Sequence, residues 1–426
     1  MRLWIYQLLM WLLWPLWVYY SIKRCRHQKN AWSCWKQLWT IQLAEFEQAP
    51  IWIHAVSLGE TQAAFILIQQ LRPIHPDQPI FFTGGNSSAI QAAIQKAVPN
   101  VSISFLPLDY AWLRRRLFKA VNPKLLILME TEFWPHLLNT AHQNKVPVAI
   151  IQARLSQSSR KRYPKYGQPL LQQLLSPVQF VAAQTQVDAQ ILIKLGVQAH
   201  RCHLLGNIKY DFNLAPNLAE HTQSLKNRLG SRWIWTAGST HAGEEEALIH
   251  AHHQLTMVAE KPLLILVPRH PSYFDNLAES LAKQGIRFAR WREWYAKETN
   301  LDSSIDLLLV DTLGQLMLCY QVAQVCFVGG SLVAWGGHNL LEPAALAKPI
   351  LTGPYNHNFS EIEKGLIDVN GMIKIHDEVE LAANLMQLYQ QPKKGKELGL
   401  NAQHFFNQQQ GATQKIISHL TKYIAK

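Results

Sequence analysis

The chain lacks the phosphate-binding and metal-binding signatures of several large enzyme classes. No G-x-G-x-x-G segment occurs in its 426 residues, which argues against a dinucleotide oxidoreductase, and no G-x-x-x-x-G-K-[ST] segment occurs, which argues against a P-loop enzyme. Its five cysteines are odd in number and form no C-x-x-C pair, so neither a disulfide framework nor a zinc site is predicted. Free cysteines fit a reducing compartment.

Acidic residues are scarce relative to basic ones. The chain has 29 Asp and Glu against 41 Lys and Arg, a formal net charge of +12. This surplus indicates a polyanionic partner, and the candidates are nucleic acid, anionic lipid headgroups and a phosphorylated substrate. Disorder is excluded because 48% of the residues are hydrophobic, enough for two domains with their own cores.

The first apolar run has no charge at all. Leu3 to Tyr20, LWIYQLLMWLLWPLWVYY, is 18 residues long, close to the minimum for a membrane-spanning helix. Its tryptophans and Pro15 fit equally well a helix that lies at the headgroup level. Residues 1–20 are therefore expected to anchor the protein to a membrane. The body is expected on the cytosolic side, because basic residues follow at Lys23, Arg24, Arg26 and Lys29.

Along the rest of the chain, apolar β-rich runs alternate with helical stretches, a pattern typical of parallel sheets. This rhythm is lost between residues 213 and 232, which we interpret as a linker because of Pro216, Asn217, Asn227 and Gly230. The predicted fold class is α/β, with two doubly wound Rossmann-like domains, residues 21–212 and 233–426, that face each other across a cleft. The last helix, around Leu400 to Tyr423, could pack back on the first domain. The predicted strands are Ile51–Val56, Ile80–Thr83, Val101–Phe105, Leu125–Met129, Val148–Ile151, Phe180–Ala182, Trp233–Ala237, Leu263–Val267, Leu307–Val310, Val325–Val328 and Pro349–Leu351.

A glycine-rich run in the second half, FVGGSLVAWGGHNLLEPAA from Phe327, reads as a strand, a turn and a helix start. Gly330 and its neighbour Gly329 lack Cβ atoms, so the backbone can approach a phosphate closely, and Ser331 adds a hydroxyl and an N–H. A glycine-rich connection with a purely structural role is the alternative.

Further along this run, Asn339 and Glu342 are three residues apart on a helix that we expect to begin near His338. A carboxylate there can accept hydrogen bonds from a ribose diol. Three other loops at strand exits in this half could also contact an anion or nucleotide: Ser239 in AGSTHAGEE, Arg269 and His270 in VPRHP, and the turn Leu313, Gly314 and Gln315 in DTLGQL.

In the first half, carboxylates follow two of the predicted strands. Glu60 in HAVSLGE has the spacing from Ser57 of a helix capping box, yet at a strand exit it could also act as a general base. Glu130 and Glu132 in METEFWP come just after another strand. Lys209 in GNIKYDF lies just before the expected linker, where it could stabilise negative charge or form a surface ion pair.

Two basic clusters also lie in the first half. Beside a membrane anchor they could bind phosphates of a membrane lipid, although a solvated face is the commoner role of such a cluster. They comprise Arg114, Arg115, Arg116, Lys119 and Lys124, and Arg154, Arg160, Lys161, Arg162 and Lys165.

Taken in order, HAVSLGE, ETEFWP, QARLSQSS, GNIKYDF, AGSTHAGEE, VPRHP, FVGGSL and NLLEPAA closely resemble the Kdo transferases of lipopolysaccharide synthesis. This resemblance implies the GT-B fold and transfer of 3-deoxy-D-manno-octulosonic acid (Kdo) from CMP-Kdo to a lipid A precursor, lipid IVA, at the cytoplasmic face of the inner membrane. The sequence departs from the usual family pattern at Leu313, Gly314 and Gln315, where the family reads Met-Gly-Glu, and at Gln152, where it has Asn.

The resemblance also assigns roles to residues. It implies that Glu60 is the base that deprotonates the acceptor, and that Glu130 and Lys209 stabilise the transition state. The implied CMP-Kdo contacts are Ser239, Arg269, His270, Leu313, Gly314, Gln315, Gly330, Ser331, Asn339, Leu340, Leu341 and Glu342. Arg114, Arg115, Arg116, Arg160 and Arg162 are the candidates for the acceptor's phosphates. No cofactor is expected, because the chain has no Asp-x-Asp pair to hold a metal and would rely on helix ends and cations at the leaving phosphate.

Two other functions fit parts of the sequence. A different membrane-associated GT-B enzyme, such as a lipid A disaccharide synthase using a UDP-sugar, would share the strand-exit loops. A membrane-tethered nucleic-acid-binding protein would explain the charge, but it would not need Glu60. We expect CMP-Kdo, the lipid A precursor and membrane lipid as partners, and no nucleic acid.

Overall fold

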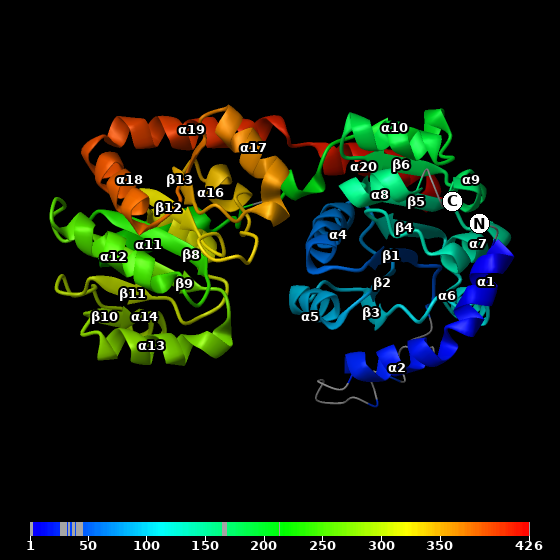
Figure 1. Ribbon diagram of the computed structural model, residues 1–426, viewed down its shortest axis with the longest axis horizontal. Coiled ribbons are helices and arrows are strands. Elements are labelled where there is room, and N and C mark those ends of the chain that lie inside the picture. Colours follow the sequence, from blue (N-terminus) through cyan, green and yellow to red (C-terminus); the bar gives the residue numbers. More distant parts are fainter. Residues whose placement is uncertain are drawn as a thin grey trace. The chain divides into compact units, whose positions relative to one another are not determined.

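The computed structural model describes residues 3–25, 32, 35, 39, 46–163, 168–212 and 214–425 (Figure 1). The chain forms two compact units, Met1–Phe212 with Gln410–Lys426 and Asn213–Gln409. In their described residues, each unit contains a seven-stranded sheet in which all the pairs are parallel. The prediction of two parallel-sheet α/β domains is therefore confirmed.

In the first sheet the strand order is β3-β2-β1-β4-β5-β6-β7. Apolar runs without alternation form its central strands because helices cover both faces; Figure 1 shows α4 and α5 on one side and α6 and α7 on the other. One core lies under each face. The strands are β1 (Ile51–Ala55), β2 (Ile80–Gly84), β3 (Val101–Phe105), β4 (Leu125–Met129), β5 (Val148–Ala153), β6 (Phe180–Ala183) and β7 (Cys202–Leu204). The helices after β1 are α4 (Leu58–Leu71), α5 (Ser87–Lys96), α6 (Ala111–Val121), α7 (Pro135–Gln143), α8 (Gln157–Arg162), α9 (Gln168–Leu175) and α10 (Gln186–Lys194), with 3-10 turns η2 (Ala199–Arg201) and η3 (Ile208–Tyr210).

The second sheet has the order β10-β11-β9-β8-β12-β13-β14. Its strands are β8 (Ile234–Thr240), β9 (Leu263–Pro268), β10 (Phe288–Arg290), β11 (Leu307–Leu309), β12 (Val325–Val328), β13 (Ile350–Thr352) and β14 (Met372–Lys374). The helices of this unit are α11 (Leu218–Leu229), α12 (Glu245–Thr256), α13 (Phe274–Lys283), α14 (Trp291–Ala296), α15 (Leu316–Val322), α16 (Leu341–Ala345), α17 (Ser360–Asp368), α18 (Glu378–Gln390) and α19 (Pro392–Gln408), with 3-10 turns η4 (Pro271–Tyr273) and η5 (His357–Phe359).

Each sheet has one point at which the strand order reverses. In the first unit the chain leaves β1 for β2 and β3 on one side and returns to β4 on the other; in the second it leaves β8 for β9 and returns to β12. Parallel strands place their following loops at one edge, and ligands of open α/β sheets bind at such a switch point. Ligands are therefore expected at the loops after β1 and β4 in the first unit, and at those after β8 and β12 in the second.

The expected linker contains a helix instead. Within residues 213–232, α11 runs from Leu218 to Leu229 and buries Leu225 and Leu229. The residues read as helix breakers lie near its ends: Asn217 precedes it, and Gly230 closes it with a φ of 76°. This amphipathic helix of three turns was not predicted, because the loop-forming residues beside it, such as Asn217 and Gly230, dominated the composition of the segment.

The strands β7, β10 and β14 were not predicted. Each has three residues and lies at an end of its sheet, where one side has no neighbouring strand. Edge positions are partly exposed, so they do not need the continuous apolar run by which the central strands were recognised.

The apolar N-terminal run forms two helices, α1 (Leu3–Leu12) and α2 (Trp14–Cys25). Pro15 explains the break near Leu13, because its ring clashes with the carbonyl four residues earlier and it has no N–H. No helix in the described residues is long and apolar enough to cross a bilayer. One face of α1 packs on the first unit. Met10 is buried there with Tyr110, the N-cap residue of α6, and with Leu113 in that helix. Arg26 and Lys29 of the basic flank lie outside the described residues.

The single C-terminal helix expected around Leu400 to Tyr423 is two helices, α19 and α20 (Ala412–Ile424). They are separated at Gly411, whose φ of 97° is a conformation that glycine adopts without strain. Asp211 accepts hydrogen bonds there from the N–H groups of Gly411 and Thr413 and from the Thr413 hydroxyl. These bonds hold the start of α20 on the first unit, with which it is counted.

Candidate functional site

Glu60 lies in the first turn of α4, directly after β1. Ser57 is the N-cap: its hydroxyl accepts from the Glu60 N–H, and the Glu60 carboxylate accepts from the N–H groups of Ser57 at 3.2 Å and Val56 at 2.8 Å. The predicted capping box is therefore formed. The side chain is buried, with 5% of the residue exposed. Burial raises the pKa of Glu60, and the nearby Glu130 carboxylate raises it further, against the opposing hydrogen bonds.

Glu60 belongs to a group of carboxylates at the β1–β4 switch point. Glu130 and Glu132 follow β4 and are half-buried. Burial, followed by the charge of Glu60, raises the pKa of Glu132 to about 7. Lys209 in η3 reaches the same place, since a Cβ added at Gly59 would lie 3.6 Å from its Nζ. The structure thus brings together Glu60, Glu130 and Lys209, and like charges that share one site raise the pKa of a carboxyl group.

Three residues have backbone conformations that residues other than glycine rarely adopt. Glu130 has a φ of 54° and Gln152, at the end of β5, a φ of 61°; in the second unit Ser239 has a φ of 58°. All three lie at the carboxyl ends of strands. Such outliers persist only where the surroundings enforce them, and they cluster at functional sites. Gln152 donates to Asn207 at 3.1 Å, so its longer side chain still joins the β5 loop to the segment before Lys209.

In the second unit, Glu244 occupies the anion site that the glycine run was predicted to offer a phosphate. The Glu244 carboxylate is fully buried and accepts from four backbone N–H groups, those of His241, Gly330, Ser331 and Leu332, at 2.7–3.0 Å. The N–H groups of Gly330 and Ser331 are therefore already used. The Ser331 hydroxyl is also taken, because it donates to the Val328 carbonyl and accepts from the Gly353 N–H.

This arrangement corrects the prediction for Gly330 and Ser331, which build the loop instead of presenting free donors. The helix N-terminus after β8 is likewise occupied by the chain's own carboxylates. Glu245 accepts from the Gly243 N–H at 3.1 Å, and burial raises its pKa to about 7. Three of the four N–H donors to Glu244 are 86–88 residues away, so no local pattern could identify this role.

Asn339 and Glu342 do lie together, as their spacing predicted. The Asn339 amide donates to the Glu342 carboxylate at 3.3 Å and its oxygen accepts from the Leu341 N–H. The helix starts at Leu341 and not near His338, so Asn339 precedes it. The side chains of Leu340 and Leu341 are fully buried.

The remaining predicted contacts of this unit surround the same edge. Arg269 and His270 follow β9, with the Arg269 N–H donating to the Thr240 carbonyl, which ties this exit to the β8 exit. In the turn before α15, Leu313 is exposed and Gly314 has a φ of 86°. Because glycine has no side chain, none projects from the turn at position 314. Gln315 is the N-cap residue of α15 without a side-chain cap bond.

An aromatic cluster at this edge was not found in the sequence. His241, after β8, stacks on Trp335 at 4.5 Å and its Nε2 lies 2.8 Å from Nε2 of His338. Burial lowers the pKa of His241 to about 4 and that of His338 to about 3. Both rings are then neutral at pH 7, so one can donate to the other's lone pair. Trp335 is 59% exposed and offers a flat surface, and the His241 ring on which it stacks lies 5.1 Å from that of His270.

The basic clusters are only partly free to bind a phosphate. Arg114 is fully buried and paired with Asp109 at 2.8 Å, which corrects its assignment to the acceptor. Arg160 is paired with the buried Asp188 at 3.0 Å. Arg115, Arg116 and Arg162 are exposed, and Lys165 lies outside the described residues. Among the residues that the structure describes, no group of three or more His, Cys, Asp or Glu has the geometry of a metal site.

The chain is similar to proteins of known identity. Residues 29–212 match the family of 3-deoxy-D-manno-octulosonic-acid transferases (kdotransferases). A UDP-GlcNAc 2-epimerase from Neisseria meningitidis, 12% identical, covers 88% of this chain and all of its own with a TM-score of 0.56, which shows a shared fold. The C-terminal CMP-Kdo binding domain of WaaA from Acinetobacter baumannii is 31% identical over 44% of this chain and 96% of its own, with a TM-score of 0.40.

A relative over nearly the full length comes from Haemophilus influenzae. This 3-deoxy-D-manno-octulosonic acid transferase is 34% identical over 380 residues, which are 88% of this chain and 87% of that protein. A stretch of 380 residues is longer than either unit, so the similarity extends over both. The chain therefore belongs to the family of 3-deoxy-D-manno-octulosonic acid transferases, the Kdo transferases.

Proposed function

We propose that the protein is an inverting GT-B glycosyltransferase that moves Kdo from CMP-Kdo to lipid IVA, a lipid A precursor, in lipopolysaccharide biosynthesis. Family membership supports the transferred sugar. The observation that carries the chemistry is Glu60, a buried carboxylate with a raised pKa at the switch point of the first sheet. A raised pKa makes a carboxylate a stronger base toward a hydroxyl acceptor.

In the proposed reaction, Glu60 takes the proton of the acceptor hydroxyl as its oxygen attacks the anomeric carbon of Kdo. The bond between that carbon and the CMP phosphate oxygen breaks at the same time, so the configuration inverts and no covalent enzyme intermediate is needed. Glu130 stabilises positive charge that develops on the sugar, and Lys209 stabilises negative charge nearby. Their closeness to Glu60 supports these roles.

The second unit is proposed to bind the donor. Arg269 and His270 would hold the phosphate of the donor. Glu342 would accept hydrogen bonds from the ribose hydroxyls, and Asn339 would orient the Glu342 carboxylate. Ser239 and the turn Leu313, Gly314 and Gln315 complete the proposed contacts. Gly330 and Ser331 contribute only by shaping the loop, since Glu244 uses their N–H groups. The leaving phosphate is stabilised without a metal in this scheme.

We also propose that α1 and α2 lie in the headgroup region at the cytoplasmic face of the inner membrane. Their outer surface is strongly apolar and rich in tryptophan, as expected of an interfacial helix. Exposed Arg115, Arg116 and Arg162 add attraction to anionic lipid or to the acceptor's phosphates. The exposed apolar residues are Trp4, Leu8, Leu9, Trp11, Leu12, Leu13, Trp14, Leu16, Tyr19 and Ile22.

Incubation of the purified chain with CMP-Kdo and lipid IVA in detergent tests the proposal. We expect release of CMP and a product heavier by one or more Kdo units, both read by mass spectrometry. A UDP-sugar with the matching acceptor should give no UDP. Release of UDP would contradict the donor, and release of CMP without a heavier lipid would contradict the acceptor.

A further inference from the structure

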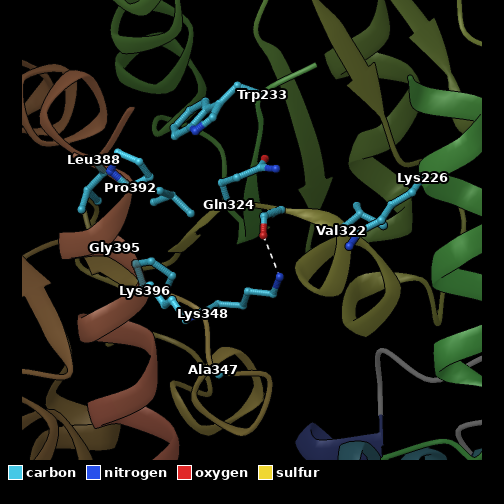
Figure 2. A pocket seen from close by; sticks show the side chains of 13 residues that line it. Lys226, Trp233, Val322, Gln324, Ala347, Lys348, Leu388, Pro392, Gly395 and Lys396 are labelled. Carbon is cyan, nitrogen blue, oxygen red and sulfur yellow. Dashed lines mark hydrogen bonds between the residues drawn. The ribbon is translucent and has the colours of Figure 1, made fainter. Parts of the chain in front are cut away.

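A pocket of about 230 Å³ lies at the edge of the second sheet away from the donor loops (Figure 2). Three of its lining residues come just before parallel strands: Trp233 before β8, Gln324 before β12 and Lys348 before β13. Loops proposed to bind CMP-Kdo follow β8 and β12. The shorter of these two strands, β12, has four residues and spans about 13 Å, so this pocket is a separate site.

The pocket carries positive charge from three different elements. Lys226 is on α11, Lys348 precedes β13 and Lys396 is in the first turns of α19, and none of the described residues that line the pocket is acidic. Figure 2 shows Lys226 and Lys348 directed toward the same part of the space, with the Lys348 ammonium donating to the Ala323 carbonyl at 2.8 Å. Burial, together with the Lys226 charge, lowers the pKa of Lys348. An anion between these ammonium groups would remove this repulsion.

A helix end adds to the field. The 17-residue α19 begins at Pro392 in the wall of the pocket, with no side-chain cap bond and no acidic residue in its first turn. The N-terminus of a long helix carries partial positive charge and favours anions.

Part of the pocket's lining is apolar. It includes Trp233, Leu388 and Pro392, and Trp233 is partly exposed. The volume corresponds to roughly seven or eight water molecules, the size of a small organic compound. A bare inorganic anion would leave the apolar residues uncovered, whereas a compound with both an anionic group and a ring or alkyl body would contact both kinds of residue.

We propose that this pocket binds a small soluble organic phosphate, with the phosphate between Lys226, Lys348 and Lys396 and its apolar body against Trp233 and Leu388. The site is independent of the donor and acceptor sites of the transfer reaction. Lysine ammonium groups are suitable partners for the phosphate, because each supplies charge and up to three donors.

Phenyl phosphate serves as the probe, with inorganic phosphate and phenol as the partial ligands. The full-length chain is acetylated briefly with acetic anhydride in the presence of each compound, and the modification of every lysine is read by peptide mass spectrometry. We expect phenyl phosphate to slow the modification of Lys226, Lys348 and Lys396, inorganic phosphate to do so less and phenol not at all. Lys393, on the same turn of α19 but outside the pocket, is the internal control.

Calorimetry on variants gives an independent measurement. Lys226→Ala with Lys396→Ala removes two exposed ammonium groups without disturbing the core and should weaken phenyl phosphate binding by roughly tenfold or more. Lys393→Ala should bind as the wild type does. Equal protection of Lys393, wild-type affinity in the double variant, or protection by phosphatidic acid vesicles but not by phenyl phosphate would each overturn the proposal.

Discussion

Glu60 has two roles at the residue scale, because one carboxylate closes the capping box of α4 and is also the proposed base. Glu60→Gln keeps an oxygen that can accept the capping hydrogen bonds but cannot take a proton. Turnover of CMP-Kdo should fall by roughly 10²–10⁴-fold while CMP-Kdo affinity stays close to that of the wild type. Initial rates and calorimetry measure the two effects.

Ser57→Ala separates these roles. It removes the hydroxyl that caps α4 and should cost about 1 kcal/mol of unfolding free energy. If Glu60 acts only as a cap, both variants should lose stability and turnover in proportion. A Glu60→Gln enzyme with wild-type turnover would eliminate the base.

Glu132 should make stability depend on pH. Its pKa is about 7 in the folded protein against 4.5 for an unperturbed glutamate, so the folded state holds the proton that the unfolded state releases. Stability is therefore lost as the pH rises from about 4.5 through 7. Glu132→Gln abolishes this loss and should gain roughly 3 kcal/mol over the wild type at pH 8 but little at pH 4.5.

Urea unfolding at the two pH values measures this difference, with Glu220→Gln on the exposed side of α11 as the control for charge removal. A Glu132→Gln difference that is the same at both pH values would show that the carboxyl group does not titrate between them.

At the scale of elements, Glu244 joins the exits of β8 and β12 through four backbone N–H groups. Glu244→Ala leaves these donors buried without an acceptor, which should destabilise the second unit by about 3–5 kcal/mol. Glu245→Ala should cost less, because burial opposes the ionisation of Glu245 and raises its pKa to about 7, whereas four backbone N–H groups hold the Glu244 carboxylate. Equal losses of unfolding free energy in urea would contradict the assignment to Glu244.

The outer face of α1 should govern membrane binding. Leu8 and Leu12 are one turn apart and exposed, while Met10 and Tyr6 face the protein. Leu8→Glu with Leu12→Glu should reduce vesicle binding at least tenfold, since each buried leucine contributes about 1.5–3 kcal/mol, and should leave detergent activity intact. The matched control is Leu400→Glu, an exposed leucine on α19.

Residual binding of the double variant should then disappear at high salt, because Arg115, Arg116 and Arg162 act by screened attraction. Vesicle sedimentation measures both effects. A double variant that stays on vesicles at high salt would show a further apolar contact.

At the scale of the whole molecule, the chain returns to its first unit at its end. Ile416, Ile417, Leu420 and Ile424 of α20 are buried in a core with residues of α4 and the first sheet. Deletion of residues 412–426 should remove roughly 6–12 kcal/mol of apolar burial, an upper bound that still exceeds the margin of a typical domain. The first unit should unfold, and transfer should be lost.

The second unit should survive that deletion, because its residues 213–409 contain none of α20. Calorimetry with CMP and circular dichroism test this: CMP should still bind, and about half of the helical signal should remain with a cooperative melt of its own. Loss of CMP binding would show that the second unit requires the first.

The sequence by itself determined the parts of the protein whose signals are local. Buried parallel strands need continuous apolar runs, so the central strands of both sheets could be predicted. The Glu60 capping box and the Asn339–Glu342 pair could be predicted from their spacing. Ordered motifs likewise indicated the Kdo transferase family. The short edge strands and α11 were missed because their residues are partly exposed or flanked by stronger loop signals.

Only the tertiary structure decided which groups are free to act. Arg114 reads as part of a basic cluster but is buried against Asp109, and the Ser331 N–H reads as a phosphate donor but is bonded to Glu244, 87 residues away. Asp211 similarly captures α20 across 202 residues. A hydrogen bond or ion pair between distant segments leaves no periodic trace in the sequence, because each partner needs only to be polar and correctly placed by the fold.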